Sequence, residues 1–375
     1  MKNSRYSRFG FSLLGMAALL AYVLACRPAF SPDGSKVLIP VANEANQEMA
    51  LVLYDRGSGK SEVVFTAHKA EEQFPPVSAT WLPDGKRAAV ICGHPGNPGS
   101  VHVLTLPLGT SQPVRMFDLD LGEESESTVF LPPVTSGSCL FLAQKSIHRI
   151  NLHTGEMKTS EVFAAEEDGT IMLTGQGNQI FYVSGQPAKE DQAADFTFGR
   201  LDPESLKLAP IAKLPAAEFG DLSPYFAVTP DGAQAVFPSS KQRQLAILKN
   251  QALAKKIQLQ GRFEKGLLGN VVWSAGAKTI FAAFSLKTGD NDLLNVGILE
   301  VAVETGDMKF YPLFHAAEDG LEFLHQVAIS PDGRFVAASS ALLEKIKPEI
   351  RALYLLDTAN PDRKYTRIPL ILPRN

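Results

Sequence analysis

One tripeptide, Pro-Asp-Gly, recurs four times along this chain, and each copy is followed by an apolar run of β-forming residues. Proline fixes φ at the first corner of a tight turn, aspartate bonds to the backbone of the turn, and glycine adopts the positive φ that closes a hairpin. The tripeptide is therefore turn chemistry and not a catalytic motif. The four Pro-Asp-Gly turns are Pro32, Asp33, Gly34; Pro83, Asp84, Gly85; Pro230, Asp231, Gly232; and Pro331, Asp332, Gly333.

The spacing of these turns indicates a repeat. Asp33 and Asp84 lie 51 residues apart, whereas Asp231 and Asp332 lie 101 apart, which is close to two such units. A decayed copy, Val272-Trp273-Ser274-Ala275-Gly276, stands between the last two turns. The segments 130–142 and 173–183 fill the two remaining places with a strand, a turn and a strand. The sequence thus predicts seven units.

A second recurring feature is a strand that ends in a polar turn and is followed by a short β-forming segment, as in the stretch from Leu51 to Phe65. Each unit then supplies four strands. Short strands in repeats of 40 to 50 residues are typical of β-propellers, whose blades bury their faces against one another. We therefore predict an all-β chain that folds as one seven-bladed β-propeller with four antiparallel strands per blade. Every unit reads complete, so closure of the ring is expected to rest on blade packing.

The Pro-Asp-Gly repeats resemble the PD40, or WD40-like, β-propeller family of exported bacterial (TolB-type) proteins. The resemblance covers nearly everything after Cys26. It implies the fold and says little about function, because the turns that carry it are structural.

The first residues read as an export signal. Lys2, Arg5 and Arg8 precede an apolar run over 11–23, which has the charge, length and order of a secretory signal and is short for a membrane span. The segment that ends at Cys26 resembles the lipobox of bacterial lipoproteins, in which the cysteine is acylated, although Leu24 is larger than usual there. An ordinary cleaved signal and an uncleaved anchor are the alternatives. We expect residues 1–25 to be a lipoprotein-type signal peptide and 26–375 a single propeller domain.

The expected location is the periplasmic side of the cell envelope, membrane-anchored through Cys26. Arg27 follows the cysteine directly, and an Asp at that position favours the inner membrane in enteric bacteria, so Arg27 favours the outer membrane. The other cysteines, Cys92 and Cys139, fall on strands of neighbouring units. We do not expect them to form a disulfide, because their Cα atoms would have to come within bonding range.

In a propeller, the turns between the first and second strands and between the third and fourth strands share one face, which we call the turn face. The segments that join the outer strand of one blade to the inner strand of the next, which we call connectors, reach the opposite connector face. Six of the seven connectors carry acidic residues, whose charges would ring the axis and attract a cation or a basic partner. Ordinary solvation of exposed loops is the alternative. These residues are Glu71, Glu72, Glu123, Glu124, Glu166, Glu167, Asp168, Glu218, Glu264, Glu318 and Asp319.

Several kinds of chemistry find no support in the sequence. The net charge of −4 offers no basic footprint for nucleic acid, and the seven histidines lack the spacing of metal ligands. We predict no metal, cofactor or catalytic residue. The expected function is a monomeric scaffold that binds an envelope protein or a small ligand on the loop-rich connector face. An axial-pocket hydrolase or lyase is the alternative, because propeller enzymes gather their residues from separate blades and leave no contiguous motif.

Overall fold

The computed structural model describes most of the chain after residue 26, and it forms seven four-stranded antiparallel sheets. Each sheet contains four strands that are consecutive in sequence. The predicted seven-bladed β-propeller is therefore confirmed. The described residues are 27–43, 48–68, 77–94, 97–108, 115–120, 128–135, 137–143, 146–160, 170–176, 179–185, 195–219, 225–239, 242–287, 293–317, 326–339, 352–360, 362 and 364–370.

In the first four blades the strands follow sequence order from the axis outwards. Blade 1 contains β1 (Ala29–Phe30), β2 (Lys36–Asn43), β3 (Glu48–Asp55) and β4 (Lys60–His68). Blade 2 contains β5 (Val77–Trp81), β6 (Arg87–His94), β7 (Asn97–Pro107) and β8 (Arg115–Asp120). Blade 3 contains β9 (Thr128–Thr135), β10 (Ser138–Ala143), β11 (Ser146–Asn151) and β12 (Met157–Ser160). Blade 4 contains β13 (Thr170–Gln176), β14 (Gln179–Gly185), β15 (Phe196–Leu201) and β16 (Leu208–Leu214).

The last three blades follow the same order. Blade 5 contains β17 (Ala227–Val228), β18 (Gln234–Ser239), β19 (Gln244–Lys249) and β20 (Ala252–Gln258). Blade 6 contains β21 (Gly266–Trp273), β22 (Thr279–Lys287), β23 (Leu293–Ala302) and β24 (Met308–Ala317). Blade 7 contains β25 (Val327–Ile329), β26 (Phe335–Ser339), β27 (Ala352–Asp357) and β28 (Tyr365–Pro369). Within the described part of the connectors there are two short helices, α2 (Ala216–Phe219) before blade 5 and the 3₁₀ helix η1 (Gly261–Lys265) before blade 6.

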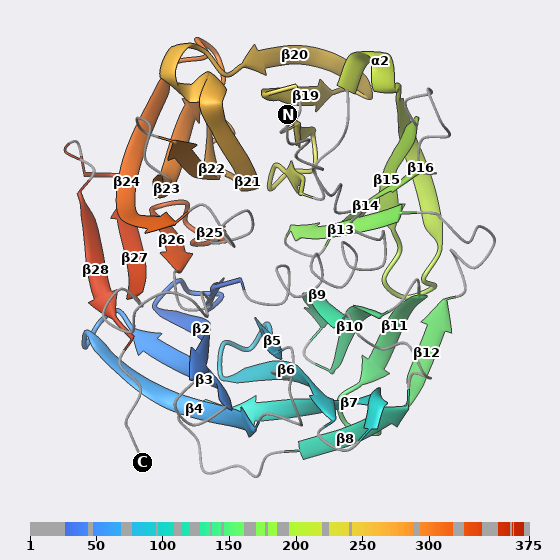
Figure 1. Cartoon of the computed structure of the whole chain (residues 1–375). Coiled ribbons are helices and arrows are strands. Elements are labelled where there is room, and N and C mark those ends of the chain that lie inside the picture. Colours follow the sequence, from blue (N-terminus) through green and yellow to red (C-terminus); the bar gives the residue numbers. More distant parts are fainter. Residues whose placement is uncertain are drawn as a thin grey trace, which may run out of the picture.

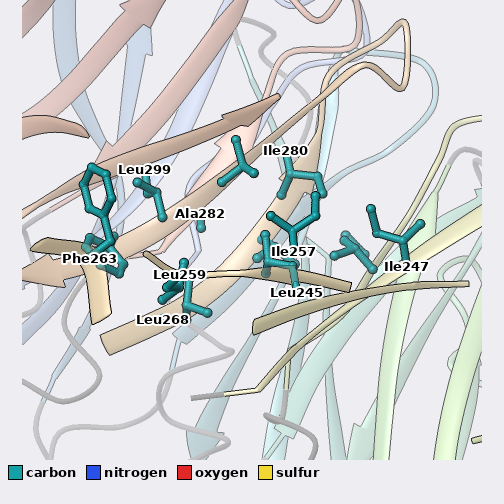
Figure 2. Packing of buried hydrophobic residues seen from close by; sticks show 14 of the residues in the cluster. Leu245, Ile247, Ile257, Leu259, Phe263, Leu268, Ile280, Ala282 and Leu299 are labelled. Atoms are coloured by element: carbon teal, nitrogen blue, oxygen red, sulfur yellow. The ribbon is translucent and has the colours of Figure 1, made fainter. Parts of the chain in front are cut away.

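The blades form a ring with the fourth strands on the outer rim (Figure 1). A hydrophobic cluster fills each of the seven seams between neighbouring blades. Figure 2 shows the cluster between blades 5 and 6, where Ile247 and Ile257 face Ile280. The seam between blades 7 and 1 is built in the same way, with Val37 and Leu353 among its fully buried residues. The ring therefore closes by apolar packing, and each described sheet is built from four strands of a single blade.

A cation reinforces the closing seam. The guanidinium of Arg56 in blade 1 lies 3.5 Å from the centre of the Phe335 ring in blade 7 and donates to the carbonyl oxygen of Gly34. An arginine over an aromatic face is attracted by the ring quadrupole. The first and last blades are thus joined on the turn face as well as in the core.

The Pro-Asp-Gly turns also contact one another around the turn face. A Cβ atom placed on Gly34 would lie 3.6 Å from Cδ of Pro331 in blade 7, and one placed on Gly85 would lie 3.8 Å from Cδ of Pro32 in blade 1. At these two seams the glycine of one turn therefore packs against the proline of the preceding blade. The residues that form these hairpins therefore also form contacts between neighbouring blades.

Both tryptophans make the same bond between blades. The indole Nε1 of Trp81 donates to the carbonyl oxygen of Ala29 in blade 1 at 2.9 Å, and that of Trp273 donates to Ala227 in blade 5 at 3.1 Å. Each tryptophan occupies the last position of an inner strand. The repeat thus extends to a side-chain bond that ties one inner strand to the previous one.

In the decayed turn of blade 6, the residue with positive φ is not the glycine. Gly34, Gly85, Gly232 and Gly333 adopt positive φ as predicted, but in blade 6 the positive φ of 54° falls on Ala277 and not on Gly276. The amide of Ala277 donates to the carbonyl oxygen of Ser274 at 2.9 Å, which is the bond that glycine makes in the intact turns. An alanine therefore holds a left-handed conformation that disfavours a Cβ atom.

Replacement of Ala277 by glycine should stabilise the protein. Removing the Cβ atom relieves a left-handed strain of about 1–2 kcal/mol, and the greater chain entropy of glycine offsets part of the gain. We expect the free energy of unfolding to rise by about 0.5–1 kcal/mol, measured by urea denaturation. Gly85→Ala is the matched reverse change at an equivalent turn, where a Cβ atom would make only an ordinary contact, 3.8 Å from Cδ of Pro32, and it should destabilise. A lower free energy of unfolding for Ala277→Gly would show that the backbone at Ala277 is not strained.

The cysteines agree with the expectation that they do not pair. Cys92 and Cys139 are both free and buried. Cys92 packs in the seam between blades 1 and 2, and Cys139 in the seam between blades 2 and 3. Burial raises the pKa of the Cys92 thiol to about 12 and raises that of Cys139 as well. Both are therefore inert apolar side chains at neutral pH.

Candidate functional site

The carboxylates of the Pro-Asp-Gly turns are engaged within their own turns. Oδ1 of Asp33 accepts from the hydroxyl of Ser31 at 2.5 Å and from the amide of Ser35 at 3.0 Å. Asp231 and Asp332 accept in the same way from Thr229 and Ser330, each at 2.5 Å. These bonds brace the hairpins at Asp33, Asp231 and Asp332.

The same bonds predict sensitivity to acid. The Ser31 hydroxyl and the Ser35 amide lower the pKa of Asp33 to about 2, and the corresponding bonds lower the pKa values of Asp231 and Asp332. The folded pKa lies below the unfolded value of about 3.9, so this stability is complete above about pH 5 and is lost as the pH falls towards 2. The melting temperature should therefore drop between pH 5 and pH 2.

A variant with asparagine at positions 33, 231 and 332 provides the comparison for this acid sensitivity. Its melting temperature should fall less steeply over the same pH range, because the carboxylates that titrate are gone. Equal slopes for the two proteins would show that these turns do not contribute to acid sensitivity.

Most of the acidic connector residues lie outside the described residues. Those are Glu71, Glu72, Glu123, Glu124, Glu166, Glu167, Asp168, Glu318 and Asp319. The two that are described, Glu218 in α2 and Glu264 in η1, are both exposed. Oε1 of Glu264 accepts from the amide of Gly261 at 3.1 Å, and Arg262 and Lys265 share its helix. The charge of this connector is therefore mixed. The long loops between second and third strands of blades 4, 6 and 7 also fall largely outside the described residues.

A set of polar side chains that belong to no motif shares one position relative to the turns that follow the inner strands. Each occupies the position four residues before the residue that opens its turn; this position lies at or just before the first residues of the inner strand in four blades and within β21 in blade 6. The residues are Arg27, Ser78, Tyr225, Asn270 and Gln326, and all but Arg27 are buried. The sequence signal was available, because alignment on the turns places these polar residues in one column.

Three of these residues form one cluster between blades 5, 6 and 7, which we call the axial cluster. Asn270 donates through Nδ2 to the carbonyl oxygen of Val327 at 2.7 Å and accepts from its amide at 2.8 Å. This amide pair ties β21 to β25. Nε2 of Gln326, the residue before Val327, donates to the hydroxyl of Tyr225 at 3.5 Å. The axial cluster therefore joins residues that are distant in sequence.

The electrostatics of the axial cluster suit recognition more than acid–base catalysis. Tyr225, Asn270 and Gln326 are 8%, 5% and 5% exposed. Burial raises the pKa of the Tyr225 phenol, so it stays protonated at neutral pH and acts as a hydrogen-bond donor. The other two side chains are neutral amides. The axial cluster is thus an uncharged set of donors and acceptors.

A second feature is a depression of about 290 Å³ on blade 6, lined by residues of β23, β24 and the turn between them. The Tyr311 hydroxyl donates to Oε2 of Glu300 at 2.6 Å, and Nζ of Lys309 lies 4.9 Å from the centre of the Tyr311 ring. Burial raises the pKa of Tyr311 to about 12. Its polar groups thus contact one another across the outer strands.

Metal-ligand clusters and membrane-spanning helices are both absent from the described part of the chain. No group of three or more His, Cys, Asp or Glu side chains is placed to hold a metal ion there. Neither is any described helix long and apolar enough to cross a membrane.

Comparison with known proteins establishes the fold. No model of a known protein family matches the chain, and no curated protein does. Solved structures match over most of its length. The complex of KlAtg21 with the coiled coil of AgAtg16 has a TM-score of 0.56 at 11% identity and covers 90% of this chain and 95% of that one. The fold is that of a β-propeller.

Two further structures extend the comparison. The periplasmic gluconolactonase PpgL of Pseudomonas aeruginosa has a TM-score of 0.53 at 14% identity and covers 89% of this chain and 96% of that one. TolB of Acinetobacter baumannii has a TM-score of 0.45 at 14% identity and covers 90% of this chain and 64% of that one. A protein in complex with a coiled coil and a gluconolactonase thus share this architecture, so the fold by itself does not assign a function.

Proposed function

We propose that this chain is a binding protein of the cell envelope whose connector face takes a basic segment of an envelope protein. The observation that carries the proposal is the exposure of Glu218 and Glu264, which stand on connectors that lead into inner strands. With the other acidic connector residues they would surround the axis with charge of one sign, which attracts a basic partner from a distance. The basic residues Arg262 and Lys265 weaken this field locally at blade 6.

The neutral axial cluster supports binding over the hydrolytic alternative. Hydrolysis needs a base, an activated nucleophile or a metal-bound water at the reacting atom. Tyr225, protonated by its raised pKa, and the amides of Asn270 and Gln326 supply none of these. They can, however, select a ligand by hydrogen bonding.

The proposed lipid anchor on Cys26 would orient the molecule. The inner strand β1 begins at Ala29, three residues after Cys26, and three extended residues span at most about 10 Å. Because β1 runs from the connector face to the turn face, an acylated Cys26 would hold the connector face next to the membrane. The partner would then be a protein segment close to the membrane surface. Incorporation of labelled palmitate that Cys26→Ser abolishes would test the anchor.

The experiment for the proposed function is capture from an envelope extract by residues 27–375, which contain every strand of the closed ring. The test variant has neutral residues at Glu71, Glu72, Glu166, Glu167, Glu318 and Asp319. The matched control is neutralised at six carboxylates on or beside the turns of the opposite face, Glu62, Glu156, Glu204, Glu304, Asp307 and Asp362. We expect a partner that the test variant loses, that the control retains, and that weakens with salt. Equal capture by all three proteins would refute an acidic binding face.

A further inference from the structure

Tyr225 and Gln326 meet across the width of a blade. Tyr225 lies just before the inner strand of blade 5 and Gln326 just before that of blade 7, yet the Gln326 amide nitrogen lies 3.5 Å from the Tyr225 hydroxyl. Blades 5 and 7 are separated by blade 6, and inner strands converge only towards the axis of a propeller. The two side chains therefore meet at the axial end of these blades.

Their hydrogen bonding is incomplete. A distance of 3.5 Å is long for an N–H···O bond, which normally measures about 2.9–3.0 Å. Within the described ranges, this contact is the only side-chain hydrogen bond that either residue makes. The phenol O–H of Tyr225, and the second N–H and Oε1 of Gln326, remain for another group. Both residues are more than nine-tenths buried, where the low local dielectric strengthens a hydrogen bond to a ligand.

Asn270 fixes the backbone next to Gln326. Asn270 pairs with both backbone groups of Val327, the residue directly after Gln326. A side chain that starts from a backbone fixed in this way is preorganised, so less ordering is needed when a ligand binds. Asn270 is thus a positioning residue, and Tyr225 and Gln326 are the groups left to contact a ligand.

We propose that Tyr225 and Gln326 form a site for a primary carboxamide, such as the side chain of an asparagine or glutamine in the bound partner. The carboxamide of Gln326 can pair with it through two parallel bonds, one N–H to the ligand oxygen and one ligand N–H to Oε1. The second lone pair of the ligand oxygen then accepts from the Tyr225 hydroxyl. This ligand class deepens the proposed binding function and rests on it.

The hydrogen-bonding groups of the site disfavour two similar polar ligands, a carboxylate and a polyol. A carboxylate could accept from Tyr225 but has no N–H for Oε1 of Gln326, and its charge would be buried without a partner in the axial cluster. A hydroxyl of a polyol offers one donor on one atom and does not match the planar carboxamide edge. Primary carboxamides are therefore preferred over both.

The binding test uses residues 27–375 and ligand-observed NMR titration with N-acetylglutamine methylamide, with N-acetylglutamate methylamide and sorbitol as comparison probes. Gln326→Leu should weaken binding of the glutamine probe about tenfold, and Tyr225→Phe about threefold to tenfold. Gln244→Leu removes another buried glutamine, from the third strand of blade 5, and should leave binding within about twofold. No binding to the unmodified chain, equal binding to Gln326→Leu, or preference for either comparison probe would overturn the proposal.

A stability measurement separates a ligand site from a structural pair. The double variant Tyr225→Phe with Gln326→Leu replaces both polar groups by apolar groups of similar shape, which should leave the melting temperature unchanged or raise it. A clear decrease would mean that the two side chains support the fold, which overturns the proposal. The glutamine probe carries no charge, so its binding should persist in the variant with neutral connectors. Loss of the basic partner and loss of carboxamide binding are thus distinguishable failures.

Discussion

Trp273→Ala is expected to lower the free energy of unfolding by about 3–5 kcal/mol, the usual range for deleting a buried aromatic side chain. The indole is 3% exposed and packs in the cluster between blades 5 and 6. Its Nε1 also satisfies the carbonyl oxygen of Ala227. The loss therefore combines a cavity with a buried acceptor left unpaired. Urea denaturation followed by far-ultraviolet circular dichroism measures it.

The bond and the packing can be separated at this site. Trp273→Phe keeps most of the apolar contact and removes the N–H donor, so it should cost about 1–3 kcal/mol. Tyr365→Ala removes a ring that is 40% exposed on the outer strand of blade 7 and serves as the control, with an expected loss well below that of Trp273→Ala. Similar losses for Trp273→Ala and Tyr365→Ala would show that the seam bond does not hold the blades together.

The second large effect is expected at Gly297, in the third strand of blade 6. A Cβ atom there would overlap the carbonyl oxygen of Tyr311 on the neighbouring strand and would lie 2.8 Å from the Phe310 ring. Backbone cannot move aside as a flexible side chain can, so Gly297→Ala should cost about 3 kcal/mol. The register of β23 and β24 shifts at this position, which brings the two backbones close.

Gly276→Ala is the matched control for Gly297→Ala. It changes a glycine of the same blade that has no heavy atom within 4 Å of a Cβ position, so its effect should be small. The midpoint of urea unfolding compares the two variants. A loss at Gly276 as large as that at Gly297 would mean that the cost comes from glycine in general and not from the close approach in β23.

Much of the fold could be predicted because the informative residues act locally. Pro32, Asp33 and Gly34 form their turn through φ preferences and bonds within five residues, so the motif reports the same hairpin wherever it occurs. Blades 3 and 4, which have no copy of the motif, follow from the spacing together with a strand, a turn and a strand in each segment. The left-handed Ala277 was not predictable, because alanine has no preference for that conformation and only the surrounding blade holds it there.

The site was less accessible to sequence reasoning than the fold. Acidic residues on connectors are visible as a sequence pattern. Their combined electrostatic potential, however, depends on how the connectors are arranged around the ring, which local sequence does not determine. Tyr225 and Gln326 are separated by 101 residues, and neither belongs to a motif. Each reads by itself as an ordinary polar residue before a strand.

The number of blades, the strands within them and the side of each turn follow from local sequence, because turn chemistry and alternation are properties of a few neighbouring residues. How the ring closes depends on long-range packing, through the cluster of Val37 with Leu353 and the stacking of Arg56 on Phe335. Long-range packing also decides which polar side chains meet at the axis. Those contacts arise only when seven sheets have packed in a circle, since convergence at an axis is a property of the whole ring and not of any one blade.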